Sequence, residues 1–376
     1  MRKHNFLKPI IPLLALLFFI TSSKAQSVSK VDNSTLTDHN STIAIGDTVI
    51  ELGNNIMVIY QDKKNNYWFG SWVDGVYWYD GKTTLHFTTK DGLSHDRIDE
   101  IQEDKLGNIY FRTSGGINKF DGQKFTTLSI ANNSNNEWKL EPNDLWFKSS
   151  QDSGLVYRYD GVVLHRLTFP NTKLIDEYNA SHPRSNQSFP FKPYDVYSIY
   201  KDSKGNIWFG TAVLGVCRYN GRTVDWISED DVTELHNGPA NGVRAIIEDK
   251  DGFFWFNSMY RYNVYGNDSL SKSNSQKQTF YSREKGIGSL DGKKDSDLWE
   301  YLSIAKDNNN ELWIATYRDG VWHYDGKNIS HYSVKDGSKD ITLFYIYKDN
   351  NGNLWLGTHE AGAYKFNGKT FEKFRP

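Results

Sequence analysis

The chain has 376 residues, a net charge of −2 and an aromatic content of 15%, with 12 Trp, 23 Tyr and 21 Phe. This balance, without a basic stretch, argues against a nucleic-acid partner, because phosphate binding requires a basic face. The many aromatic, Gly, Asn and Asp residues are typical of β-structure with tight turns.

The first 25 residues have the pattern of a secretory signal peptide. Arg2 and Lys3 precede the apolar run at 10–20, and the small residues at 23–25 resemble a cleavage site. The apolar run is short for a bilayer span, so an uncleaved anchor is the weaker alternative. We predict a periplasmic or secreted protein with no membrane span after cleavage, a flexible polar leader at 26–42 and a folded domain at 43–376.

One phrase recurs along the folded domain. It reads DKKNNYWFGSWVDGVYWYDG at 62–81, DSKGNIWFGTAVLGVCRYNG at 202–221 and DNNGNLWLGTHEAGAYKFNG at 349–368. Its aromatic anchor occurs seven times, at Trp68, Tyr110, Trp146, Trp208, Trp255, Trp313 and Trp355. The six steps from first to last average about 48 residues, which is close to the repeat length of propeller proteins.

Each copy contains four strand candidates separated by turns rich in Gly, Asn and Asp. In the last copy the candidates are LFYIYKD, NLWLGT, GAYKFNG and KTFEKF. A lone four-stranded sheet cannot bury both of its faces, whereas sheets stacked around an axis can. We therefore predict an all-β fold, a seven-bladed β-propeller of four-stranded antiparallel blades, with the anchor aromatics packed between blades. The mode of ring closure stays open: residues 43–52 could add a strand to the last blade, but all seven copies are complete without it.

Two features that resemble reactive or metal-binding groups have structural interpretations. Cys217 is the single cysteine, and we predict that it is a buried apolar residue. The Asp and Asn residues of the turns lack the distal acidic ligand of a calcium loop, so they are assigned to turn formation. No metal, cofactor or catalytic residue is predicted.

The aspartate, the G-N-[LI]-W-[LF]-G-T step and the closing [ND]-G resemble the two-component regulator propeller repeat over about residues 54–374. The resemblance implies a propeller outside the cytoplasm that recognises a ligand, often a glycan fragment, as in periplasmic sensor regions of hybrid histidine kinases. No kinase region follows the last copy before Pro376, so we expect a free-standing propeller.

A ligand site is predicted where long connections and the turns between second and third strands emerge on one face. The long connections are residues 170–193, 228–241 and 283–298. The turns carry aromatic, cationic and acidic side chains, which suit the flat faces and hydroxyl groups of a sugar. The predicted ligand-binding residues are Trp72, Asp74, Gln151, Tyr260, Arg261, Tyr317, Arg318, Asp319, His359 and Glu360.

The favoured function is a sensor-like module that binds a small polar ligand, with an oligosaccharide as the leading candidate. One alternative is a scaffold that binds a protein partner beside a separate signalling protein. A second alternative is a propeller lyase or hydrolase that uses His359 and Glu360 for proton transfer. The sequence favours binding over catalysis and does not define an oligomeric state.

Overall fold

The computed structural model describes residues 45–131, 136–149, 154–170, 173–174, 176, 180, 195–228, 242–256, 260–265, 280–286 and 301–376. The predicted signal peptide and leader lie outside these residues and remain predictions. Across the described ranges, no helix has the length and apolar character needed to cross a bilayer.

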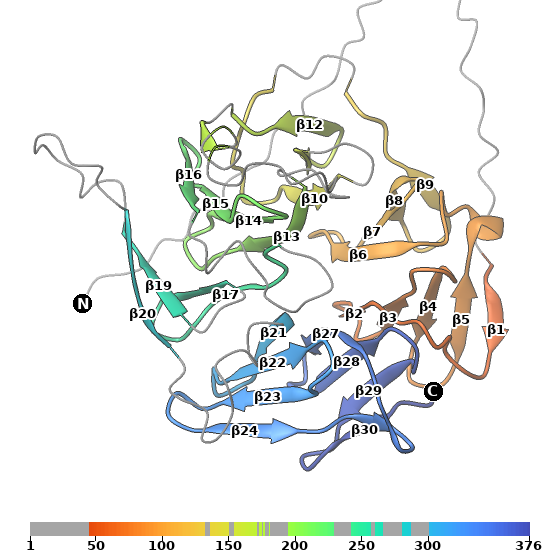
Figure 1. The fold of residues 1–376 in the computed structure, drawn as a ribbon. Helices are drawn as coiled ribbons and strands as arrows, with labels where there is room; N and C mark the ends of the chain where they lie inside the picture. The colour runs from red at the N-terminus through yellow and green to blue at the C-terminus, as the bar shows by residue number, and fades with distance from the viewer. Residues whose placement is uncertain are drawn as a thin grey trace, which may run out of the picture. The chain divides into compact units, whose positions relative to one another are not determined.

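Seven antiparallel sheets are arranged around a common axis, which confirms the predicted propeller (Figure 1). We number the blades 1 to 7 in chain order. The strands of blades 1 to 3 are β2 (Val58–Gln61), β3 (Tyr67–Gly70), β4 (Val76–Tyr79) and β5 (Thr84–Phe87); β6 (Ile98–Glu103), β7 (Ile109–Thr113), β8 (Gly116–Phe120) and β9 (Phe125–Thr127); and β10 (Leu145–Lys148), β11 (Leu155–Tyr159) and β12 (Leu164–Thr168).

Blades 4 to 7 continue the same order from the inner strand to the outer strand. Their strands are β13 (Val196–Lys201), β14 (Ile207–Thr211), β15 (Val216–Tyr219) and β16 (Val224–Ile227); β17 (Ile246–Glu248), β18 (Phe254–Phe256), β19 (Tyr260–Val264) and β20 (Tyr281–Lys285); β21 (Tyr301–Lys306), β22 (Leu312–Thr316), β23 (Val321–Tyr324) and β24 (Ile329–Tyr332); and β27 (Leu343–Lys348), β28 (Leu354–Thr358), β29 (Ala363–Phe366) and β30 (Phe371–Lys373).

Three small elements lie outside this pattern. A 3-10 helix, η1 (Thr89–Asp91), follows blade 1, and a hairpin of β25 (Lys335–Asp336) and β26 (Lys339–Asp340) lies between blades 6 and 7. Helical backbone occurs at Leu174, Asp176 and Ala180 in the connection between blades 3 and 4.

The repeated aspartate connects the first turn of a blade to its anchor aromatic. In blade 4, Oδ1 of Asp202 accepts the backbone N–H groups of Lys204 and Asn206 at 3.0 and 2.8 Å. Its Oδ2 accepts the indole N–H of Trp208 at 2.9 Å. The same aspartate-to-anchor bond occurs in five other blades, at Asp62–Trp68, Asp104–Tyr110, Asp249–Trp255, Asp307–Trp313 and Asp349–Trp355. The assignment of these aspartates to turn formation is confirmed, and each also orients an anchor ring.

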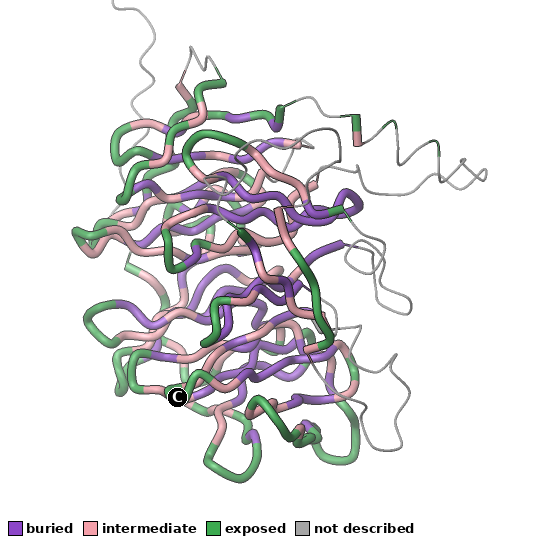
Figure 2. The backbone as a smooth tube through the Cα atoms, turned by 90° about the vertical axis from the view of Figure 1, so that its left-hand side faces the viewer, coloured by how far each residue is buried: buried purple, intermediate pink, exposed green. Residues whose placement is uncertain are grey.

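The anchors pack between adjacent blades, as predicted, and all seven are at most 5% exposed. The ring of Trp68, for example, lies 5.2 Å from Phe111 of blade 2, measured between ring centroids. Buried residues therefore lie along the strands in the interior, whereas exposed residues gather in the turns (Figure 2). Cys217 is fully buried, and burial raises the pKa of its thiol.

The ring closes without a strand shared between its first and last blades. The hydroxyl of Tyr67 donates to Asp349 at 2.7 Å, and Phe374 packs against Phe69 with centroids 5.7 Å apart. The predicted extra strand exists as β1 (Asp47–Val49), but it pairs with β5 of blade 1. Of the two possibilities that the sequence left open, the structure has the second: β1 does not join the last blade, which contains four strands from its own repeat.

Blade 3 departs from the other blades at its inner edge. Among the described residues its sheet has three strands, and β10 occupies the inner edge. The missing backbone donors are replaced by side chains of blade 2. Gln102 donates to the carbonyl of Trp146 at 2.7 Å, and Arg112 donates to the carbonyls of Lys148 and Ser149, each at 2.9 Å. Blade 3 therefore contributes the side chain of its second strand to the axis.

Candidate functional site

A cavity of about 380 Å³ lies on the axis of the propeller. Its walls come from the inner strands β2, β6, β13, β17, β21 and β27, with Lys148 of β10 and with Trp72 from the β3–β4 turn. Most of these lining residues belong to the first half of their strands. The cavity is therefore at the end of the axis where the predicted turns and long connections emerge.

One wall of the cavity is aromatic and joins blades 1, 2 and 7. The ring of Trp72 lies 4.8 Å from that of Phe344 and 6.3 Å from that of His359, in edge-to-face geometry. Arg97 lies over the Trp72 ring at 4.1 Å from its centroid. Asn55 fixes this wall, because its side chain accepts from the Trp72 backbone N–H and donates to the His359 carbonyl, each at 2.9 Å.

The other wall is cationic and aromatic. The guanidinium of Arg244 lies 4.3 Å from the centroid of the Tyr197 ring. Burial lowers the pKa of Arg244, and the interactions with Tyr197 and Tyr317 oppose this effect. In the β22–β23 turn, Arg318 lies over the ring of Tyr317 at 5.2 Å. Flat rings beside fixed cations occur on this wall as well as on the first.

The structure brings together some of the predicted ligand-binding residues at this end of the axis. Trp72 and His359 are in ring contact, and Tyr317 lies within electrostatic reach of the cavity residue Arg244. His359 Nδ1 and Glu360 Oε2 are 3.8 Å apart, and both side chains are about half exposed. Glu360 also accepts from the backbone N–H of Thr342 at 2.9 Å.

Other predicted residues are engaged within their own blades or cannot be placed. Asp74 accepts from the hydroxyl of Tyr77, and the backbone N–H of Asp319 donates to Thr316 at 3.0 Å. Neither aspartate lines the cavity. Gln151, like most of the three long connections, lies outside the described residues.

Two predicted turn residues are in a strand. Tyr260 and Arg261 begin β19, and Arg261 pairs with Trp255 in the strand register. Its guanidinium contacts Asp251 and Glu284 at 3.1 and 2.6 Å. The placement of these two residues in the inner turn is therefore corrected, because both belong to β19 and pair within its sheet.

Among the lining residues, sequence reasoning predicted Trp72 and missed the others, including Lys148 and Glu100. Three of the missed residues are Tyr197, Arg244 and Phe344. They share the second position of the inner-strand segment, which reads Met57, Asp99, Tyr197, Arg244, Leu302 and Phe344 in the blades that have this strand. The fourth position of the same segment is Ile in all six, at Ile59, Ile101, Ile199, Ile246, Ile304 and Ile346. The variation at the second position was the available signal, whereas the invariant Ile position gives none, although four of its six residues also line the cavity.

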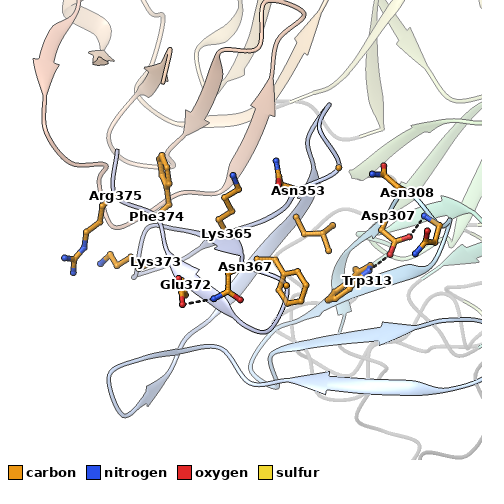
Figure 3. A pocket seen from close by; sticks show the side chains of 15 residues that line it. Asp307, Asn308, Trp313, Asn353, Lys365, Asn367, Glu372, Lys373, Phe374 and Arg375 are labelled. Carbon is orange, nitrogen blue, oxygen red and sulfur yellow. Dashed lines mark hydrogen bonds between the residues drawn. The ribbon is translucent and has the colours of Figure 1, made fainter. Parts of the chain in front are cut away.

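A larger hollow of about 1020 Å³ lies between the turns of blades 6 and 7 (Figure 3). Several polar groups in it are already occupied by local structure. Asp307 accepts from the indole N–H of Trp313 at 3.1 Å, and the side chain of Asn367 donates to Glu372 at 2.7 Å (Figure 3). We favour the axial cavity, where all seven blades converge, over this groove formed by turns.

One group of side chains in the described part of the chain has ligand atoms close enough for a metal ion. These atoms belong to Asp307, Glu311 and His323 and lie within 4.8 Å of one another. His323 and Glu311 are already 2.8 Å apart, and both oxygens of Asp307 accept from N–H groups. The hydrogen bonds account for the cluster, so we assign it to blade 6 structure.

Fold and cavity together define the class of protein, a seven-bladed propeller with a ligand-sized cavity on its axis. A family model described as "Two component regulator propeller" matches residues 51–73, 190–212 and 337–360. The chain carries the two-component regulator propeller repeat, as its sequence pattern predicted.

Similar proteins fall into two groups. Histidine kinase P4 of Formosa agariphila is 25% identical over 259 residues, which are 65% of this chain and 17% of that relative. The extracellular domain of a hybrid two component system from B. thetaiotaomicron is 17% identical with a TM-score of 0.52, and the match covers 86% of this chain and 41% of that one. The chain therefore spans less than half the length of these relatives.

The second group consists of enzymes with the same architecture. Virginiamycin B lyase from Staphylococcus aureus is 13% identical with a TM-score of 0.57, and the match covers 85% of this chain and 97% of that one. At this identity the likeness establishes the shared propeller fold. The chain is thus a propeller that is similar in fold to extracellular domains of two-component systems.

Proposed function

We propose that this propeller is a ligand-binding, sensor-type module that acts in the periplasm or outside the cell and recognises an oligosaccharide at the axial cavity. The observation that carries the proposal is the pair of aromatic rings that line one side of the cavity, Trp72 and Phe344, with the ring of His359 in contact with both. Aromatic faces bind the C–H faces of sugars, and nearby polar groups fix the hydroxyls. The family repeat supports the sensor-type role.

The size of the cavity agrees with a short saccharide. Its volume of about 380 Å³ falls near the lower end of the range of about 300–1,000 Å³ typical of small-molecule sites. Trp72 is only half-buried, so its ring remains available to a ligand. Its position is fixed on both sides, by Phe344 and by Arg97, which reduces the entropy lost on binding.

The test is calorimetric titration of the purified protein with a panel of neutral and acidic oligosaccharides. Trp72→Ala should weaken binding of any saccharide that the wild type binds by roughly tenfold or more, because loss of a stacked ring costs on the order of 1.4 kcal/mol. Tyr265→Ala is the matched control, since Tyr265 is an aromatic residue that is 42% exposed and does not line the cavity. Equal affinities for the two variants would contradict the proposed site.

Catalysis is the second candidate, and His359 beside Glu360 is the observation that favours it. The distance of 3.8 Å between them exceeds hydrogen-bond range, and both groups face solvent. A lyase or hydrolase would form product in the same panel, and His359→Ala would abolish turnover. Saccharide binding without product formation favours the sensor-type module.

A scaffold function predicts a different result. A protein partner would then bind the same face in the absence of any saccharide, and Trp72→Ala would weaken that association. Titration of a candidate signalling protein with and without the bound saccharide separates this alternative from ligand sensing.

A further inference from the structure

Lys148 is the one cavity residue contributed by blade 3. It is the last residue of β10, and its side chain reaches the axis because the described part of blade 3 has no strand inside β10. The side chain lies deep in the ring but keeps accessible surface, as expected of a group that faces a cavity. Burial lowers the pKa of Lys148, which is the signature of an ammonium group whose charge is poorly solvated.

The ammonium group of Lys148 has no ion pair in the described part of the chain, although Glu100 and Asp99 interact with it electrostatically across the cavity. Its Nζ donates to the backbone carbonyl of Tyr197 at 3.2 Å. Among the described residues no carboxylate lies within 4 Å of this nitrogen, whereas Asp99, on the same cavity, is paired with Arg97 at 3.1 Å and Arg112 at 2.6 Å. The two carboxylates stabilise the Lys148 charge from a distance but do not pair with it, so an anionic group at hydrogen-bond distance would stabilise it further.

Arg244 supplies a second cation on the same cavity. Its guanidinium lies on the face of Tyr197, the residue whose carbonyl accepts from Lys148. Its Nε is buried and has no hydrogen-bond partner. An unpartnered N–H on a buried guanidinium is a donor ready for an acceptor, and planar anions are the acceptors that fit it.

One acidic group limits what the anion can be. Glu100 lines the cavity, where its Oε1 accepts from Gln102 at 2.6 Å and its Oε2 is buried without a partner. That second oxygen would repel a bare anion but would accept a hydroxyl donor. The cavity therefore suits a molecule that carries both an anionic group and hydroxyl groups.

We propose that Lys148 and Arg244 recognise the anionic group of an acidic saccharide, while Glu100 accepts one of its hydroxyls. This inference rests on the proposed function and narrows its ligand from saccharides in general to those with a carboxylate or a sulfate ester. The carboxylate or sulfate lies toward blades 3 to 5, and the sugar face lies against Trp72 and Phe344 on the opposite wall.

The experiment titrates the purified protein with uronate-containing, sulfated and neutral oligosaccharides of matched backbone. We expect at least one acidic member to bind tenfold or more tightly than its neutral counterpart, and the two acidic series distinguish carboxylate from sulfate. Its affinity should fall as salt is raised, because added ions screen the two cations. Neutral counterparts that bind as tightly as the acidic members would overturn the inference and leave the proposed function intact.

Variants then test the two cations directly. Lys148→Met and Arg244→Met should each weaken binding of the acidic saccharide by roughly tenfold, while Lys204→Met and Arg222→Met, at exposed positions, should not. Thermal unfolding verifies that each variant is folded, and Lys148→Arg should retain binding if charge is what matters. Unchanged affinity in both cavity variants would overturn the inference. If no saccharide of either kind binds the wild type, the inference and the proposed function both fail.

Discussion

Blades 3 and 7 have the same place in the ring but are held together in different ways. In blade 7, Asp349 closes the first turn and accepts from Trp355, and the inner strand β27 pairs with β28. In blade 3, Leu140 occupies the position of that aspartate, and the indole N–H of Trp146 is buried without a partner. Blade 7 is stabilised by hydrogen bonds to the aspartate of its own repeat, whereas blade 3 receives hydrogen bonds from side chains of blade 2.

The difference shows how a repeat protein can gain a specific site. Blade 3 keeps a buried ion pair of its own, Arg158–Asp144 at 2.7 Å, and receives hydrogen bonds from Gln102 and Arg112 of blade 2. These substitutes leave Lys148 facing the axis. The blade that departs from the repeat, blade 3, is therefore also the blade that places the ammonium group of Lys148 in the cavity.

Removal of the aspartate from blade 7 should have the largest effect on stability. Asp349→Ala takes the acceptor from the turn N–H groups of Asn351 and Asn353, from the indole of Trp355 and from the hydroxyl of Tyr67. Each buried donor that is left without its acceptor costs about 1–3 kcal/mol. We therefore expect the unfolding free energy, measured in urea, to fall by roughly 3–4 kcal/mol.

The control for this variant is Asp325→Ala. Asp325 accepts two turn N–H groups, from Lys327 and Asn328, but at an exposed turn. Its loss should be much smaller, and an equal loss would mean that burial of the aspartate does not decide the effect.

Substitution of the residue that pairs with the anchor aromatic should lower the stability of the protein in blade 3 but have little effect in blade 7. Arg158 pairs with Trp146 and Lys365 pairs with Trp355 in equivalent registers. Arg158→Met leaves Asp144 buried and unpaired, which we expect to cost about 3 kcal/mol. Lys365→Met removes a half-buried cation that lies over the Trp355 ring, so the change in urea midpoint should be small. Similar losses would remove the distinction between the blades.

The side-chain cap on β10 should have a smaller, local effect. Gln102→Leu removes the donor to the carbonyl of Trp146 and should cost on the order of 1 kcal/mol. Hydrogen exchange measured by mass spectrometry should accelerate in a peptide that contains β10 and stay unchanged in one that contains β28. Uniform acceleration in both would indicate global destabilisation rather than loss of a cap.

The smallest effect should appear in acid. Burial by itself raises the pKa of Asp349, but hydrogen bonds from Trp355, Tyr67 and Asn353 outweigh it and hold the pKa below its usual value. A carboxyl with a depressed folded-state pKa stabilises the fold above its unfolded pKa of about 3.9 and loses that contribution as the pH falls through the folded pKa. The stability gap between wild type and Asp349→Asn should therefore narrow below about pH 4. A constant gap from pH 6 to pH 2.5 would contradict this linkage.

The sequence predicted the seven blades and their anchors because both depend on local patterns. Trp208 lies six residues after Asp202, the aspartate of its turn, and the same spacing recurs in most copies. It did not predict the partner of β1, which depends on a free sheet edge, or the strand position of Arg261, which depends on pairing with β18 and β20.

The candidate site was predicted only in its turn residues, such as Trp72 and His359. The inner-strand residues Arg244 and Lys148 became visible once strand register and the missing edge of blade 3 were known. Variation at the second inner-strand position was a local signal for Arg244, whereas no such pattern marked Lys148. Leu140 occupies the position that is aspartate in the other copies. This substitution was the sequence feature that set blade 3, with β10 at its inner edge, apart from the other blades.

The seam between blades 7 and 1 has a consequence for how such rings diversify. Because Tyr67 and Phe374 join the seam through side chains, the boundary of every sequence repeat coincides with the boundary of a sheet. Duplication or deletion of one genetic unit would then add or remove a whole blade without splitting a sheet, and a permuted chain opened between two other blades would keep every sheet intact.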